Sequence, residues 1–186
     1  MRILAVSGSL RESSFNTSLL RAAQEAAPEG IELELWEGIG ELPLYDDDLE
    51  TNDVPESVRR LREDWAAADA ILFSTPEYNG SIPGGLKNAI DWASRPRLEG
   101  ALRNKTVAVV GASTGQFGAL WAQQDLKRIL GVAGARVVGT EIPVARAHER
   151  IDTEGRLLDG EIFEQLRLHL TTLASEAVSV PDRAAA

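Results

Sequence analysis

Hydrophobic positions along the chain form two patterns, short continuous apolar runs and longer stretches with helical spacing. Continuous runs suit strands that are buried on both faces of a sheet, whereas apolar residues at every third or fourth position indicate amphipathic helices. We therefore expect strands at residues 2–7, 31–36, 70–74, 106–111 and 136–140. The helical pattern predicts helices at residues 19–27, 54–68, 83–93, 120–132 and 160–177.

The order of these elements predicts an α/β fold. Strands and helices alternate along the chain, which is typical of a parallel sheet with helices on both faces. In such sheets ligands bind at the carboxyl ends of the strands, near the point where the strand order reverses. The loops after the first, third and fourth strands are therefore the places to look for chemistry.

Composition narrows the functional classes. The 186 residues suffice for one domain, with 44% hydrophobic and 26% charged residues, and no apolar stretch is long enough to span a membrane or act as a signal peptide. We therefore expect a cytoplasmic protein. Cysteine is absent and the two histidines lie far apart, so no metal site is expected. A net charge of -10 disfavours nucleic acid and anionic membranes as partners.

The loop after the first strand reads GSLRESSFNTSLL, residues 8–20, and is rich in hydrogen-bond donors. A helix that begins there presents free backbone N–H groups, which attract an anion, and an arginine can bind phosphate oxygens in a fork. The loop therefore suits a monophosphate, although a capped helix in a polar loop explains it as well. The nucleotide patterns GxxxxGK[ST] and GxGxxG are both missing. The donors in the loop are Ser9, Arg11, Ser13, Ser14, Asn16 and Thr17.

Two further loops carry candidate ligand contacts. In STPEYNGSIPGG, residues 74–85, Pro76, Asn79 and Gly80 favour turns, and the ring of Tyr78 could stack on a planar heterocycle. We expect Glu77 to have a structural role, as a charge beside a helix or at an interface, rather than to act as a catalytic acid. The glycine-rich stretch GASTGQFGAL, residues 111–120, is weak evidence alone, because such turns are common without a ligand.

In combination, GSLRESSFNTSLL, PEYNGSIPGGLKNAIDW and GASTG resemble the NADPH-dependent FMN reductase family, a flavodoxin-like family of quinone, chromate and azo-compound reductases. The resemblance implies a doubly wound five-stranded sheet of order 2-1-3-4-5, with one FMN-binding domain at residues 1–175 and a flexible tail at 176–186. It also implies bound FMN, NADPH or NADH as a transient donor, a small-molecule electron acceptor, and a homodimer or homotetramer.

The family pattern is carried over onto matching positions of this sequence. It places the FMN phosphate against Ser9, Arg11, Ser14, Asn16 and Thr17, and the flavin ring beside Pro76, Glu77, Tyr78, Asn79, Gly80, Ser113 and Gly115. No catalytic side chain is expected, because the flavin N5 accepts hydride from NAD(P)H and later passes electrons to an acceptor in a ping-pong cycle. Ala119 departs from the family pattern, since many relatives have glycine there.

Other classes stay open at this point. A flavodoxin-type electron carrier that docks on protein partners fits the acidic composition, but an arginine in the phosphate loop is unusual for carriers. A flavin-free binding or signalling domain is a third possibility, and a phospho-acceptor receiver is disfavoured because the first strand lacks clustered carboxylates at its end. The acidic residues Asp46, Asp47 and Asp48 are expected to form a solvated loop.

Overall fold

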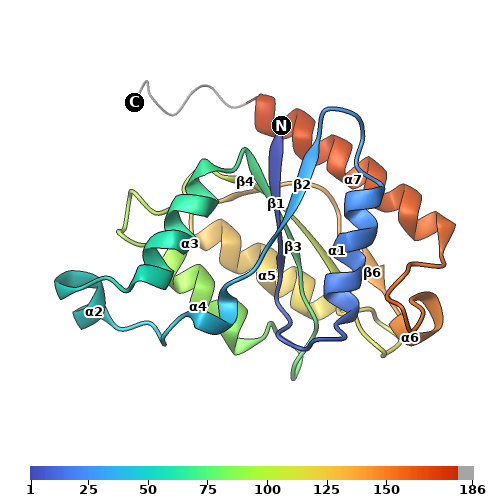
Figure 1. Cartoon of the computed structure of the whole chain (residues 1–186), viewed down its shortest axis with the longest axis horizontal. Coiled ribbons are helices and arrows are strands. Elements are labelled where there is room, and N and C mark those ends of the chain that lie inside the picture. The colour runs from blue at the N-terminus through green and yellow to red at the C-terminus, as the bar shows by residue number, and fades with distance from the viewer. Residues whose placement is uncertain (180–186) are drawn as a thin grey trace.

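A computed structural model describes residues 1–179 as one parallel sheet between two layers of helices (Figure 1). The sheet order is β2-β1-β3-β4-β5, which confirms the predicted order, and a short sixth strand pairs with the end of β4. The strands are β1 (Arg2–Ser7), β2 (Glu32–Trp36), β3 (Ala70–Ser74), β4 (Thr106–Ala112), β5 (Arg136–Val137) and β6 (Pro143–Val144).

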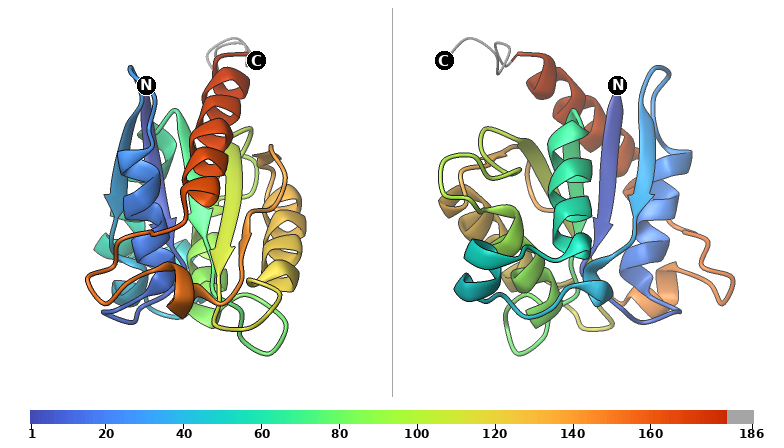
Figure 2. Two further views of the ribbon diagram at one scale, coloured as in Figure 1. Left: turned by 90° about the vertical axis from the view of Figure 1, so that its right-hand side faces the viewer. Right: turned by 60° about the vertical axis from the view of Figure 1, so that its left-hand side comes forward.

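The helices divide between the two faces of the sheet. The first and last long helices cover one face, and three helices from the middle of the chain cover the other (Figure 2). The helices are α1 (Phe15–Glu25), α2 (Asp47–Asn52), α3 (Glu56–Ala67), α4 (Gly84–Ala93), α5 (Leu120–Val132), α6 (Ala147–Arg150) and α7 (Gly160–Val178), with a 3-10 turn η1 (Ile39–Glu41).

The two hydrophobic cores follow from the alternation of side chains along the strands. Leu4 and Val6 of β1 face the core under α3, α4 and α5, while Ile3 and Ala5 face the core under α1 and α7. Within the first core the Trp65 ring contacts Phe73 edge-on, with ring centroids 5.3 Å apart. Both faces of the central strands are therefore buried, as the continuous apolar runs predicted.

Several boundaries differ from the sequence prediction. Helix α1 begins at Phe15 rather than residue 19, because Ser14 caps it. The expected loop at residues 46–48 is wrong, since Asp46 accepts a hydrogen bond from the Asp48 N–H and caps α2. Helix α7 continues to Val178, so residues 176–178 of the predicted tail are helical; residues 180–186 of that tail lie outside the described residues.

The predicted strand at residues 136–140 pairs with β4 only through Arg136 and Val137. After this pair the chain turns at Gly139, which has a φ of 73°, and returns to the sheet as β6. A β-carbon at Gly139 would come within 2.5 Å of the His169 ring, so this turn and α7 pack closely. The predicted strand therefore ends early, at a left-handed turn that packs against α7.

His169 is a buried titratable group in the second core. Its side chain is 7% exposed, and its Nε2 has no hydrogen-bond partner within residues 1–179. Burial, followed by the positive charge of Lys127, lowers the pKa of His169 to about 4, against the opposing effect of Glu141. The imidazole is therefore neutral in the folded protein at neutral pH.

A buried neutral histidine makes stability depend on pH. Between the unfolded pKa of 6.5 and the folded pKa of about 4, the unfolded chain binds a proton that the folded chain does not. Acidification from pH 7 to pH 5 is therefore expected to cost about 2 kcal/mol of unfolding free energy through this residue alone. Urea denaturation at both pH values should show that His169→Gln removes this part of the loss. An identical pH dependence in the variant and the wild type would contradict the assignment.

Candidate functional site

Three loops meet at the carboxyl edge of the sheet, where the strand order reverses between β1 and β3. The Gly8 N–H donates to the Ser74 carbonyl at 2.8 Å, and the Thr75 N–H donates to the Val110 carbonyl at 3.0 Å. These bonds continue the sheet ladder past the strand ends and hold the three loops side by side. A parallel sheet forms its ligand crevice at this kind of position.

The loop after β1 leads into the capped N-terminus of α1. The Ser14 Oγ caps α1 by accepting from the N–H groups of Asn16 and Thr17 at 3.2 and 3.3 Å. Within residues 1–179, the N–H groups of Glu12, Ser13 and Phe15 donate to no protein acceptor. Free N–H groups and the positive end of the helix dipole together favour an anion here. We call this start of α1, with the free N–H groups of residues 12, 13 and 15, the anion terminus.

Arg11 adds a full positive charge to this terminus. Its guanidinium lies over the Phe15 ring at 5.2 Å from the centroid, and one of its nitrogens donates to the Ser13 Oγ at 3.3 Å. Its backbone N–H donates to the Ser9 Oγ at 3.3 Å. The side chain is exposed, so its remaining donors are available to a bound oxyanion.

The Asn16 side chain, which was expected to contact a phosphate, makes hydrogen bonds within the protein. The side chain is 3% exposed, and its Oδ1 accepts from the Ala112 N–H and the Ser74 hydroxyl, both at 2.9 Å. Its Nδ2 donates to the Ala112 carbonyl at 3.0 Å. The amide therefore ties α1 to β3 and β4, and the contact of Asn16 with a phosphate stays a prediction.

Thr17 is committed in a similar way, because its hydroxyl donates to the Ser7 Oγ at 2.9 Å. Of the residues predicted to contact a phosphate, Ser9, Arg11 and Ser14 keep donor capacity toward the loop. The Ser14 hydroxyl accepts two N–H bonds, and its own proton has no acceptor among the described residues. It can therefore donate to a bound oxyanion.

The loop after β3 forms a tight hairpin. Tyr78 and Ser81 exchange backbone hydrogen bonds of 2.9 and 3.1 Å around Asn79 and Gly80, whose φ angles are 54° and 77°. Both central residues are left-handed, which explains why asparagine and glycine occupy them. Tyr78 is 54% exposed at one end of the hairpin, so its ring is available to a planar ligand. Pro76, which leads into the hairpin, is partly buried.

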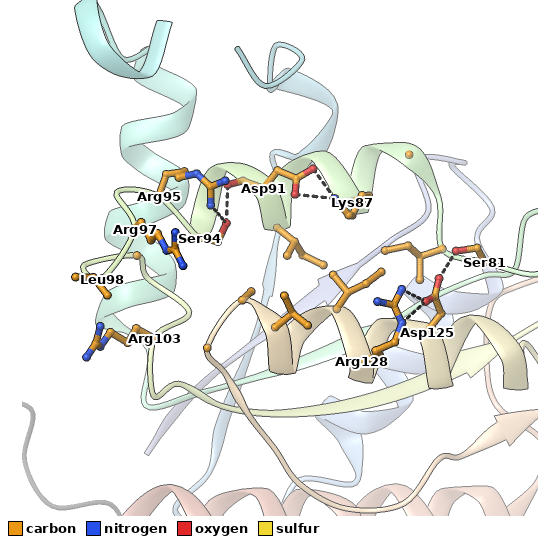
Figure 3. Close-up of a pocket in the computed structure, with 18 residues that line it drawn as sticks. Ser81, Lys87, Asp91, Ser94, Arg95, Arg97, Leu98, Arg103, Asp125 and Arg128 are labelled. Atoms are coloured by element: carbon orange, nitrogen blue, oxygen red, sulfur yellow. Dashed lines mark hydrogen bonds and ion pairs between the residues drawn. The ribbon is translucent and has the colours of Figure 1, made fainter. Parts of the chain in front are cut away.

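The hairpin is anchored to the start of α5. The Glu77 carboxylate accepts a hydrogen bond from the Ala122 N–H at 3.3 Å, so it flanks the first turn of α5. The Ser81 hydroxyl donates to the Asp125 carboxylate (Figure 3). That bond, followed by the Arg128 ion pair, lowers the pKa of Asp125 below its usual range. Two side-chain hydrogen bonds therefore attach the hairpin to α5.

The loop after β4 is held from the other side by β6 and α6. Ser113 donates its N–H to the Val144 carbonyl at 3.1 Å and accepts from the Ala147 N–H at 2.9 Å. The Gly115 carbonyl accepts from the Arg146 N–H at 3.0 Å, and Gly115 itself is exposed. Ser113 and Gly115 thus lie at the same edge as the other two loops.

A groove of about 820 Å³ lies between α4 and α5, and the sequence reasoning missed it. It begins at Ser81, next to the hairpin, and runs toward the opposite edge of the sheet. Lys87 and Asp91 line it from α4, and Asp125 and Arg128 line it from α5 (Figure 3). In the sequence, only the amphipathic pattern of residues 83–93 indicated a partly polar surface on this helix.

Two negative findings apply to the described part of the chain. Residues 1–179 contain no group of three or more histidine, aspartate and glutamate side chains placed to hold a metal ion. No helix in this range combines the length and the apolar character needed to cross a bilayer.

Comparison with known proteins identifies relatives of the whole chain. Residues 1–149 match the family model described as NADPH-dependent FMN reductase. An NAD(P)H-dependent FMN reductase of Pseudomonas aeruginosa is 41% identical over 174 residues, which are 93% of either chain. A quinone reductase of Escherichia coli is 36% identical over 174 residues, covering 92% of this chain and 90% of its own.

A solved structure agrees with these sequence matches. The flavoenzyme NAD(P)H:(acceptor) oxidoreductase FerB of Paracoccus denitrificans superposes with a TM-score of 0.84 and is 36% identical. The superposition covers 94% of this chain and 98% of FerB. Fold, length and sequence therefore point to one family.

Proposed function

This chain belongs to the NADPH-dependent FMN reductase family, and from that membership we propose that it passes electrons from NAD(P)H to quinones and other small acceptors, including azo compounds and chromate. It is an oxidoreductase whose cofactor is FMN and whose donor is NAD(P)H. When bound, FMN supplies the hydride and electron chemistry that protein side chains lack. The side chains of the three loops bind and orient the reactants.

The observation that carries this proposal is the anion terminus at the start of α1. A phosphate monoester needs several convergent donors, and the terminus provides free N–H groups, the Ser14 hydroxyl and the Arg11 guanidinium. Its position at the strand-order reversal is where flavodoxin-like folds bind FMN. The residues present therefore fit the phosphate of this cofactor.

The other two loops would hold the flavin ring. Tyr78 offers an exposed aromatic face, and the left-handed turn at Asn79 and Gly80 leaves backbone groups uncovered. On the opposite side, Ser113 and Gly115 bring a second stretch of backbone to the same edge. The Glu77 contact with α5 keeps the hairpin in place, which limits the movement of any ring bound beside it.

Donor and acceptor are proposed to use one binding place in turn. The three candidate loops share a single edge of the sheet, which supports one place that NAD(P)H leaves before the acceptor enters. Steady-state rates at several fixed acceptor concentrations are expected to give parallel double-reciprocal lines. Converging lines would show instead that donor and acceptor are bound together.

An absorption spectrum tests the function directly. The purified protein is expected to be yellow, and anaerobic addition of NADPH should bleach its flavin band within seconds. A yellow protein that NADPH does not bleach would support the flavodoxin-type electron carrier, which the net charge of -10 favours. A colourless protein that does not bind added FMN would support a flavin-free domain.

The cytoplasmic location expected from the sequence stays a prediction.

The groove between α4 and α5 is proposed as the face on which a second copy packs to form a homodimer. Its floor contains Ile82, Ile90 and Ile129, and Val132 at its far end is 81% exposed. Acid–base pairs flank these residues on both helices, Lys87 with Asp91 and Asp125 with Arg128. Arg95, Arg97 and Arg103 also line the groove. A surface with both charge signs around an apolar centre can complement itself across a two-fold axis.

Val132→Asp is expected to convert the dimer into monomers, because it places a charge where the contact would bury an exposed apolar side chain. Sedimentation velocity or light scattering of the holoenzyme would measure the change in mass. The matched control is Leu168→Asp on α7, which is 60% exposed on the other face of the sheet and should leave the mass unchanged. A wild-type protein that is monomeric at micromolar concentration would refute the assignment of this groove.

A further inference from the structure

We propose that Phe117 and Trp121 form an aromatic platform that selects planar, apolar electron acceptors; this rests on the proposed reductase function. The two side chains are 47% and 48% exposed, and their ring centroids lie 4.7 Å apart at an interplanar angle of 57°. Such exposure is unusual for a pair of large rings that contact each other, because their burial would be favourable. The pair therefore has apolar surface available for a ligand.

The platform lies next to the loops that are proposed to hold the flavin. Trp121 belongs to the first turn of α5, and the following residue, Ala122, donates its N–H to Glu77 of the hairpin. Asp125 lies one helical turn after Trp121 and accepts the Ser81 hydroxyl at the end of the same hairpin. Residues four apart share a face of a helix, so Trp121 lies on the side of α5 that faces the hairpin.

A strained turn holds Phe117 against Trp121. Gly118 and Ala119, which lie between Phe117 and Trp121 in the sequence, have φ angles of 58° and 60°. A β-carbon at Gly118 would come within 2.5 Å of the Pro143 backbone, so the turn is pressed against β6. A left-handed alanine persists only where its surroundings impose it, and such strain is frequent at ligand sites. The turn therefore presents the rings in a defined arrangement.

The chemistry of the platform favours quinones over hydrated ions. A quinone ring can cover the exposed faces of Phe117 and Trp121 and remove apolar surface from water on both partners. The overall reaction is NAD(P)H plus a proton and a quinone giving NAD(P)⁺ and a quinol, so the platform itself is neither oxidised nor reduced. An inorganic anion such as ferricyanide has no planar ring to stack and gains nothing from it.

The test compares a naphthoquinone with ferricyanide in the holoenzyme. For the double variant Phe117→Ala/Trp121→Ala, KM for the naphthoquinone is expected to rise about tenfold with little change in kcat. At saturating NADPH, the ferricyanide kinetics should stay within twofold of wild type. Trp121→Phe should retain most of the quinone affinity. Leu168→Ala, which removes an exposed apolar side chain elsewhere, should leave the KM of both acceptors unchanged.

Three results would overturn the platform. They are an unchanged KM for the naphthoquinone, an equal loss with both acceptors, and a change in oligomeric mass, which would assign the rings to an interface between copies. Failure of the proposed reductase function is detected separately. In that case NADPH does not bleach the flavin of the wild-type protein, which is measured before any variant is compared.

Discussion

Replacing Arg11 with alanine is expected to weaken FMN binding by about 1.5–3 kcal/mol, which is roughly a 10- to 150-fold increase in Kd. The guanidinium is the one cationic side chain between the end of β1 and the start of α1, where the free N–H groups of the anion terminus lie. Its loss removes charge-assisted hydrogen bonds but leaves the helix cap made by Ser14 intact. Titration of the apoprotein with FMN, followed by quenching of flavin fluorescence, measures the change.

Arg21→Ala is the matched control for Arg11→Ala. Arg21 is also an exposed arginine, and it lies in the same helix beyond the first turn, where the dipole no longer favours an anion. Its removal changes the net charge by the same amount and should alter Kd by less than about twofold. Equal affinities of Arg11→Ala and the wild type would show that the phosphate binds elsewhere.

Asn16→Ala is expected to lower the unfolding free energy by about 3–4 kcal/mol, a large effect for one polar residue. The substitution leaves both backbone groups of Ala112 and the Ser74 hydroxyl without their buried partner. It also detaches α1 from β3 and β4, so the anion terminus should lose its position relative to the hairpin. Urea denaturation measures the loss of stability, and an FMN titration below the transition should show weaker binding.

Asn52→Ala is the control for that change, because it removes the same amide from an exposed position. The Asn52 amide donates to the Asp48 carbonyl at 2.9 Å within α2, and surface losses of this kind are usually below about 0.5 kcal/mol. A similar small loss for Asn16→Ala would mean that water replaces the buried amide. The proposed link between the flavin loop and the sheet would then fail.

The sequence predicted the sheet because its central strands are buried on both faces. The apolar run at residues 70–74 and the helical spacing at residues 120–132 predicted bounds that agree with β3 (Ala70–Ser74) and α5 (Leu120–Val132). The three candidate loops were found for a related reason. In a parallel sheet the polar residues after each strand must converge at one edge, whatever their distance along the chain.

Features that depend on contacts distant in sequence could not be predicted. The polar side chain of Asn16 looked like a ligand contact, and its role as a tie became visible only with Ala112 beside it, 96 positions later. The short pairing of β6 with β4 has no periodic pattern, because two residues are too few to show one. The groove between α4 and α5 likewise required the relative placement of two helices.

The pairing of β4 with two short partners also affects how the protein behaves when concentrated. An exposed strand edge recruits other chains by extending the sheet, which is a common route to aggregation. Here β5 and β6 each present a strand of two residues, too short to act as a template. On the opposite edge, β2, Glu32 carries an exposed carboxylate, which repels an identical strand, while the exposed Glu34 pairs with Arg2 of β1. Both sides of the sheet are thus protected against edge-to-edge polymerisation.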